Sequence, residues 1–331
     1  MERAARYRYV LFAIAVACLL PLTTRSGTLA TEVLIFALAA LGCNLLLGYT
    51  GLMSFGQGIF FGLGSYAAGL SLLHLHTSLL TTLFIAGCSG ALVAAVVGWF
   101  SIRQVGVYFV MLTLAFAQMF YFLAYTLKDW TGGDNGLLNI PRPDLRLLDV
   151  QMMHLAGAWE YYTFVAAVFV IVFALLQGLA DSVFGRTLLA IRDNEARAGA
   201  VGYSVKTFKL VAFIVSGAVT GLAGALHAML TGLAPLSNIE YHTSENILVM
   251  TVIGGTGSLF ASILGATFYV LVADWLSTLW PRWLMLLGFL LIAISLYMRQ
   301  GLWGVLEASI GQLRRRTGAR AKEAARVENE T

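Results

Sequence analysis

The stretch LLTTLFIAGCSGALVAAVVGWF occupies residues 79–100 and contains no charged side chain. As an α-helix rising about 1.5 Å per residue, it is long enough to cross a hydrocarbon core of about 30 Å. Four further apolar runs have a similar length, and they cover residues 105–127, 161–179, 210–230 and 259–280. These five runs predict five helices that span a membrane.

The composition of the whole chain agrees with this prediction. Of the 331 residues, 59% are hydrophobic and only 11% are charged, whereas a soluble domain carries about 25% charged residues. The mean hydropathy is +0.81. These values exclude a soluble enzyme, a disordered regulator and a nucleic-acid-binding module. The net charge of +4 does not imply a nucleic-acid partner, because the cytoplasmic loops of membrane proteins supply a basic excess.

Shorter apolar segments raise the expected number of spans. They cover residues 9–22, 33–47, 59–73, 283–298 and, as the weakest candidate, 244–254. Three arginines precede the first segment and could begin a secretory signal, but no small-residue cleavage site is evident after Leu22, so we favour a membrane helix. The sequence predicts an all-α polytopic membrane protein, with about ten transmembrane segments in a single domain over residues 1–331.

The basic residues predict how these segments are oriented. If the N-terminus is cytoplasmic and ten segments cross, sixteen of the 21 Lys and Arg residues lie on the cytoplasmic side, as the positive-inside rule requires. Residues 128–160 then form a periplasmic loop, residues 181–209 a cytoplasmic loop and residues 299–331 a cytoplasmic basic tail. Nine crossings would place this tail outside, so either the weak segment 244–254 crosses or another segment does not; we predict ten crossings, with 244–254 as the weakest member.

Two glycine-rich stretches predict interrupted helices. GYTGLMSFGQGIFFGLGSYAAG at 48–69 contains seven glycines, and GGTGSLFASILGA at 254–266 repeats its G-x-x-S pattern before a large apolar residue. Close helix packing alone explains many such runs. Interrupted segments at corresponding positions of two halves, however, indicate the central site of a transporter. We therefore expect two pseudo-repeated halves with broken helices, and a translocation path lined by Gly51, Ser54, Gln57, Gly255 and Ser258.

Other kinds of chemistry lack a sequence signal. The chain has no G-x-x-x-x-G-K-[ST] motif, so it is not expected to bind ATP through a P-loop. Its cysteines and histidines show no metal-ligand spacing, and no catalytic cluster, cofactor site or metal site is predicted. Asp274 is the one acid in an apolar span that could serve transport, but Trp275 beside it suggests the membrane interface.

The cytoplasmic loop contains the sequence GRTLLAIRDNEARAGAVGYSVKTFKL at 185–210. It predicts a short amphipathic helix, with Leu189 and Ile191 against the bundle and a turn at Gly202. Arg192, Asp193, Glu195 and Arg197 would present charges to a protein partner. The alternative is a solvated loop that merely satisfies the positive-inside rule, but that rule requires no acidic residues.

Three segments together resemble a known family: residues 48–69, the span 107–122 leading to TGGDNGL at 131–137, and residues 185–226. They are similar to the permease subunits of bacterial branched-chain amino-acid ABC importers, specifically the M-type subunit of the high-affinity Leu/Ile/Val system. The resemblance covers about residues 33–303. Urea and other amide permeases of the same superfamily share the glycine-rich motif, so an importer of urea or amides is an alternative.

The resemblance implies a fold of the importer-permease type in the bacterial inner membrane. It also implies a heterodimer with a second permease subunit, two cytoplasmic ATPase subunits and a periplasmic substrate-binding protein. The cytoplasmic loop would couple to an ATPase through Arg192, Asp193, Glu195, Arg197 and Gly202. Glu195 and Ala196 match the start of the importers' E-A-A motif, but Arg197 replaces its second alanine, and Gly202 lies seven rather than six residues after Glu195.

A secondary transporter that works without ATPase partners is the rival interpretation. Such proteins commonly carry ionisable residues at membrane depth, and this sequence has few. Membrane lipid is an expected partner of the chain in either case.

Overall fold

The computed structural model describes residues 13–21, 24, 26–147, 150–153, 155, 157–297 and 301–304, and they are predominantly helical. Most of the predicted basic tail, 299–331, and the three arginines before the first segment lie outside these residues. Six described helices are long and apolar enough to cross a membrane: α2 (Gly27–Thr50), α4 (Leu79–Ser101), α5 (Val107–Thr126), α7 (Ala158–Asp181), α10 (Val205–Thr231) and α12 (Leu259–Leu279).

Shorter elements complete the described fold. Three are shorter helices, α3 (Gln57–His74), α11 (Tyr241–Gly254) and α13 (Trp283–Tyr297), and residues 13–21 are also helical. The others are α6 (Lys128–Thr131), α8 (Val183–Asp193), α9 (Glu195–Ala200), η1 (Gly133–Asn135), η2 (Leu236–Asn238) and the antiparallel strands β1 (Leu145–Leu147) and β2 (Val150–Met153).

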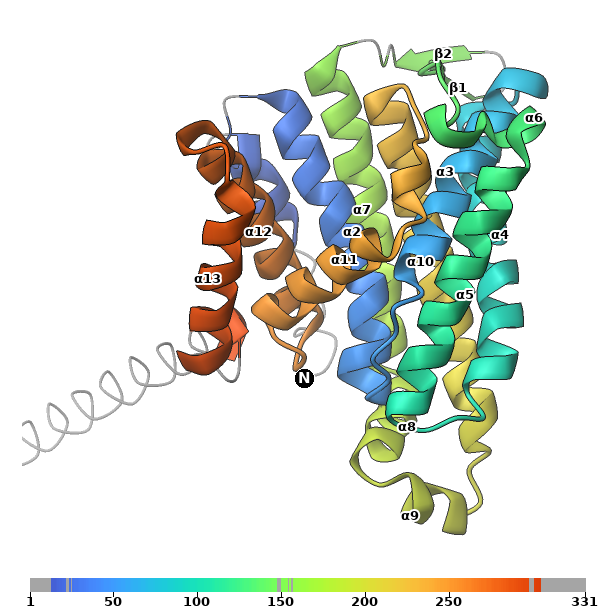
Figure 1. The fold of residues 1–331 in the computed structure, drawn as a ribbon, viewed down its shortest axis with the longest axis vertical. Helices are drawn as coiled ribbons and strands as arrows, with labels where there is room; N and C mark the ends of the chain where they lie inside the picture. The colour runs from blue at the N-terminus through green and yellow to red at the C-terminus, as the bar shows by residue number, and fades with distance from the viewer. Residues whose placement is uncertain are drawn as a thin grey trace, which may run out of the picture.

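The five secure spans and the all-α polytopic class are confirmed, and every predicted segment overlaps helical residues. The count of ten is only approximate. The segment 33–47 belongs to the 24-residue α2, which the sequence pattern shortened because Glu32 interrupts the apolar run. The weak segment 244–254 lies in α11, whose 14 residues extend only about 21 Å and run at an angle to the long helices (Figure 1).

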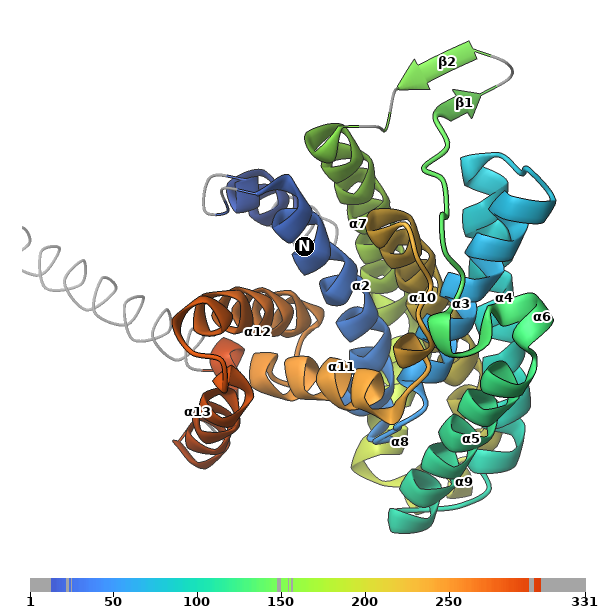
Figure 2. The same cartoon turned by 45° about the horizontal axis from the view of Figure 1, so that its top comes forward.

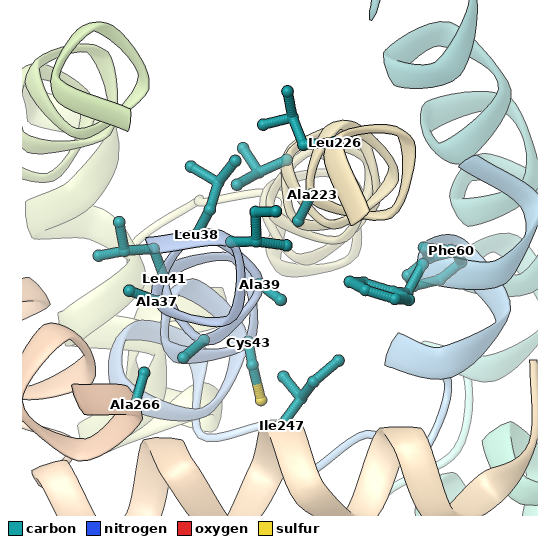
Figure 3. Close-up of a cluster of buried hydrophobic side chains, with 14 of the residues drawn as sticks. Ala37, Leu38, Ala39, Leu41, Cys43, Phe60, Ala223, Leu226, Ile247 and Ala266 are labelled. Carbon is teal, nitrogen blue, oxygen red and sulfur yellow. The ribbon is translucent and has the colours of Figure 1, made fainter. Parts of the chain in front are cut away.

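Helix α2 lies at the centre of the bundle, where it packs against α7, α10, α11 and α12. Figure 3 shows its side chains pointing in several directions, with Leu38 toward Leu226 of α10 and Cys43 toward Ile247 of α11. A helix that is apolar on all sides is stable when it is surrounded by other helices. In agreement with this position, α2 is the most buried of the six long helices.

Glycines allow α10 to lie directly on its neighbours. A Cβ atom added at Gly224 would lie 1.9 Å from the carbonyl oxygen of Phe61 in α3, and one added at Gly217 would lie 2.7 Å from that of Gly90 in α4. Without side chains at these positions the backbones approach closely, as small residues permit between membrane helices.

The two ends of the bundle carry different elements. The hairpin and α6 lie at one end, and α8, α9 and the turn between α4 and α5 lie at the other (Figures 1 and 2). The turn residue Arg103 therefore shares an end with the 181–209 loop, whereas Lys128 and Arg142 lie at the hairpin end. This arrangement is the one that the positive-inside analysis expects.

Part of the loop predicted at 128–160 packs against the end of α10. Leu137 and Ala234 exchange backbone hydrogen bonds of 3.1 and 2.8 Å. Arg142 donates from Nε to the carbonyl oxygen of Met229 at 2.7 Å and from its second guanidinium nitrogen to that of Leu230. The guanidinium thus binds carbonyl groups at the end of α10 that lack helical partners.

Candidate functional site

The first glycine-rich stretch lies at an interruption between α2 and α3. Helix α2 ends at Thr50, and Gly51 adopts φ +72°, a left-handed conformation that glycine accepts without strain. Residues 51–56 are not helical. Ser54 is buried and accepts a hydrogen bond of 3.1 Å from the Gly56 amide, while the Phe55 amide donates to Thr113 Oγ1 of α5 at 3.2 Å. Side chains thus bind backbone groups that the break releases.

The second stretch lies at the interruption between α11 and α12. Gly255 has φ +110° and ψ +148°, a conformation that favours glycine, and Ser258 caps α12 by accepting from the Phe260 amide at 3.3 Å. Both G-x-x-S copies therefore lie where one helix ends and the next begins. Both glycines cap the helix before them, but their backbone conformations differ, because Gly51 is left-handed helical whereas Gly255 has φ +110° and ψ +148°.

Tertiary packing brings the second break against α2. Asn44 of α2 donates from Nδ2 to the carbonyl oxygen of Ser258 at 2.8 Å. One turn further, a Cβ atom on Gly48 would lie 2.6 Å from the carbonyl oxygen of Thr256. The end of α2 that leads into the first break therefore touches the second, although the two motifs are some 200 positions apart in the chain.

Asn44 is a residue that the sequence analysis missed. It is fully buried, and its Oδ1 atom has no hydrogen-bond partner among the described residues. The one sequence signal was a single amide within the apolar run 33–47. Polar side chains at membrane depth are functional candidates because burying them without partners is costly.

Gln57 joins two helices. It is fully buried, donates from Nε2 to Ser216 Oγ at 3.1 Å and accepts at Oε1 from Thr220 Oγ1 at 2.8 Å. Ser216 in turn donates to the carbonyl oxygen of Gly42 in α2 at 2.7 Å. These contacts hold α3 on α10. The Gln57 side-chain amide, which was predicted to line a solute path, is therefore hydrogen-bonded to two side chains of α10.

The other predicted path residues differ in exposure. Gly51 is exposed and Ser258 partly exposed, whereas Ser54 and Gly255 are buried. Asp274 is exposed near the far end of α12, about 22 Å along the helix from the second break. The structure therefore brings the two G-x-x-S motifs together and leaves Asp274 apart.

Helix α8 is amphipathic, as predicted, and attaches to the first break. Leu188 and Ile191 are buried, while Leu189 is only partly buried. The Arg192 guanidinium donates to the carbonyl oxygen of Gly48, and its Cγ would lie 3.1 Å from a Cβ atom on Gly51. Arg192 therefore binds the end of α2 instead of only presenting its charge outward.

Helix α9 is held by an ion pair to the start of α10. Glu195 Oε2 lies 2.5 Å from Lys209 Nζ, and the Lys209 side chain is only 4% exposed. Asp193 and Arg197 remain exposed, and the chain then turns at Gly202, which has φ +100°. Of the four charges expected to face a partner, Arg192 and Glu195 are thus bound to other helices. Asp193 lies 3.4 Å from Arg192, but its side chain is 72% exposed, and Arg197 is exposed as well.

The described residues contain no group of three or more His, Cys, Asp or Glu side chains that could hold a metal ion. At the two helix breaks, hydroxyl and amide side chains form hydrogen bonds with the backbone groups that the breaks release. Such paired breaks suit passage of a solute better than catalysis.

Comparison with known proteins agrees with this geometry. Residues 26–295 match the family described as branched-chain amino acid transport system / permease component. The chain belongs to this family. Both helix breaks and the whole of α8 and α9 lie within the matched part of the permease.

Two LivM proteins are among the relatives of the chain. The permease is 29% identical over 325 residues to the high-affinity branched-chain amino acid transport system permease protein LivM of Escherichia coli K12, covering 92% of the permease and 76% of LivM. For LivM of Salmonella typhimurium the identity is 28%, with coverage of 88% and 73%. These matches confirm the resemblance to M-type permeases.

The chain is also similar to a protein named for another solute. The autoinducer 2 import system permease protein LsrC of Photorhabdus laumondii is 27% identical over 307 residues, which cover 86% of the permease and 87% of LsrC. No solved structure matches the chain.

Proposed function

We propose that the permease forms part of the translocation path of an ATP-driven importer for branched-chain amino acids in the bacterial inner membrane, with both termini cytoplasmic. In this proposal it pairs with a second permease subunit. Two ATPase subunits hydrolyse ATP on the cytoplasmic side, and a periplasmic binding protein delivers the amino acid. The similarity to LivM over most of the chain supports this substrate class.

The contact between Arg192 and the end of α2 carries the proposal. Arg192 belongs to the loop proposed to meet an ATPase, and it binds Gly48, three residues before Gly51. Asp193 and Arg197, exposed beside it, are available to the ATPase surface. A movement of α8 and α9 would therefore pull directly on the first helix break.

The chemistry of the breaks fits a zwitterionic solute with an apolar side chain. Helices α3 and α12 begin at the two breaks, and helix N-termini favour a carboxylate. The surrounding bundle is apolar and places few full charges at depth. We propose that Gly51, Ser54, Gly255 and Ser258 shape the path, with Gln57 holding α3 in place and Asn44 adding an amide oxygen.

The test is uptake by the complete complex in proteoliposomes, with ATP hydrolysis measured in the same samples. Arg192→Met should reduce uptake of radiolabelled leucine per ATP hydrolysed, because α8 then loses its bond to α2. Arg186→Met is the matched control, since Arg186 is exposed on the same helix. Unchanged coupling in the Arg192 variant would refute the proposed route.

The same preparation separates the rival functions. Gradient-driven leucine uptake by the permease alone, without ATPase subunits, would establish a secondary transporter. Competition by isoleucine and valine, but not by urea, short amides or autoinducer 2, is the result expected for a branched-chain amino-acid importer.

A further inference from the structure

A hollow separate from the helix breaks lies between the end of α4 and the start of α10. Its volume is about 380 Å³. The wall combines two cations, an aromatic ring, a hydroxyl and two apolar side chains: Arg103, Lys206, Trp99, Thr207, Ile102 and Leu210. It lies at the end of the bundle that carries α8 and α9.

The two cations of this hollow are available to an external anion. Arg103 and Lys206 are both exposed, and neither forms an ion pair within the described part of the chain. The Arg103 guanidinium stacks over the Trp99 ring at 5.2 Å, which holds the charge at the mouth of the hollow. Lys209, three residues from Lys206, already has Glu195 as its partner.

The start of α10 adds to the positive potential. This helix has 27 residues, and the side chain of its N-cap, Ser204, forms no capping hydrogen bond. Lys206 and Thr207 lie in its first turn, where the helix dipole favours an anion.

An apolar stripe continues from the hollow along α4. Leu92, Val96 and Trp99 are spaced so that they share one face of the helix, and they are 66%, 48% and 57% exposed. Along a membrane helix such a stripe suits an acyl chain. A soluble phosphate would gain nothing from it.

We propose that this hollow binds the phosphate headgroup of an anionic phospholipid, with an acyl chain along the stripe on α4. Basic pockets between membrane helices recognise such headgroups. The wall contains no acidic side chain to bind the ammonium group of a zwitterionic lipid, so the preference is for net negative charge.

Native mass spectrometry of the full-length permease in detergent tests the proposal, with phosphatidylglycerol, phosphatidylcholine or inorganic phosphate added separately. The wild type should retain phosphatidylglycerol in preference to phosphatidylcholine. Loss of a cation near a membrane surface weakens binding of an anionic lipid by about fivefold, so R103Q/K206Q should weaken it by at least about tenfold. The control R186Q/R197Q removes the same charge from two exposed arginines at the same end of the bundle.

Equal losses in both double variants would reduce the effect to net charge and overturn the proposal. Equal binding of phosphatidylglycerol and phosphatidylcholine by the wild type would also overturn it. This comparison uses only the wild type, so its result does not depend on whether a variant folds. Displacement of phosphatidylglycerol by millimolar inorganic phosphate would instead indicate a site for a small soluble anion.

Discussion

Replacing Glu195 with Gln should release α9 from the start of α10. The change keeps the shape of the side chain but removes the negative charge 2.5 Å from Lys209 Nζ. Lys209 is 4% exposed, so its ammonium group would remain buried without a counter-charge. Breaking a fully buried pair in this way costs about 3–5 kcal/mol. Glu195 is 45% exposed and water reaches it, so we expect about 1–2 kcal/mol.

This cost applies to the state in which α9 is docked. Opening of α9 lets Lys209 reach water, so the open population should rise about 5- to 30-fold. Trypsin cleavage after Arg197, which lies within α9, reports this population when opening is fast relative to cleavage. The measurement is the initial cleavage rate at low trypsin concentration for the purified permease.

Two further variants make the test specific. Asp193→Asn removes the same charge from an exposed neighbouring carboxylate and should leave the rate within about twofold of the wild type. The double variant E195Q/K209M contains no buried cation, so its rate should return toward that of the wild type. Equal rates for E195Q and D193N, or additive effects in the double variant, would refute the assigned role of the pair.

Three other substitutions probe the packing that positions the breaks. Gly224→Ala should cost about 1–3 kcal/mol and lower the melting temperature, because the new methyl group meets the Phe61 carbonyl oxygen at 1.9 Å, whereas Gly257→Ala, with no atom within 4 Å, should change it little. Gln57→Leu should destabilise the permease by about 1–3 kcal/mol in the same assay, since two buried hydrogen bonds to α10 are lost; an unchanged melting temperature would show that they contribute nothing. Arg142→Gln should speed amide hydrogen exchange in residues 229–234 but not in α3, and uniform acceleration would instead indicate global destabilisation.

Local signals were sufficient for much of the fold. Long apolar runs can satisfy their backbone groups in lipid only as helices, so five spans were placed within a few residues of their observed ends. The same reasoning shortened α2, because Glu32 is a charged residue that a bundle can accommodate inside a longer helix. The segment 244–254 was expected to cross, but α11 is short and inclined, and sequence hydropathy does not report inclination.

For the candidate site, too, the sequence predicted some features and the tertiary structure alone revealed others. Glycine and serine patterns located both helix breaks, because a broken helix needs residues that tolerate unusual backbone angles and bind freed amides. The pattern could not show that Gln57 would be engaged by Ser216 and Thr220, which lie about 160 residues away.

The amino-acid order alone established a polytopic helical membrane protein and the positions of its helix breaks, and it predicted the sidedness of its charges. These properties follow from transfer of side chains into lipid and from local backbone geometry, which depend on neighbouring residues. Only the tertiary structure placed Asn44 against the second break, attached Arg192 to the end of α2 and paired Glu195 with Lys209. Each of these contacts joins different helices, and which helices meet depends on how glycine-lined surfaces fit together across the whole bundle.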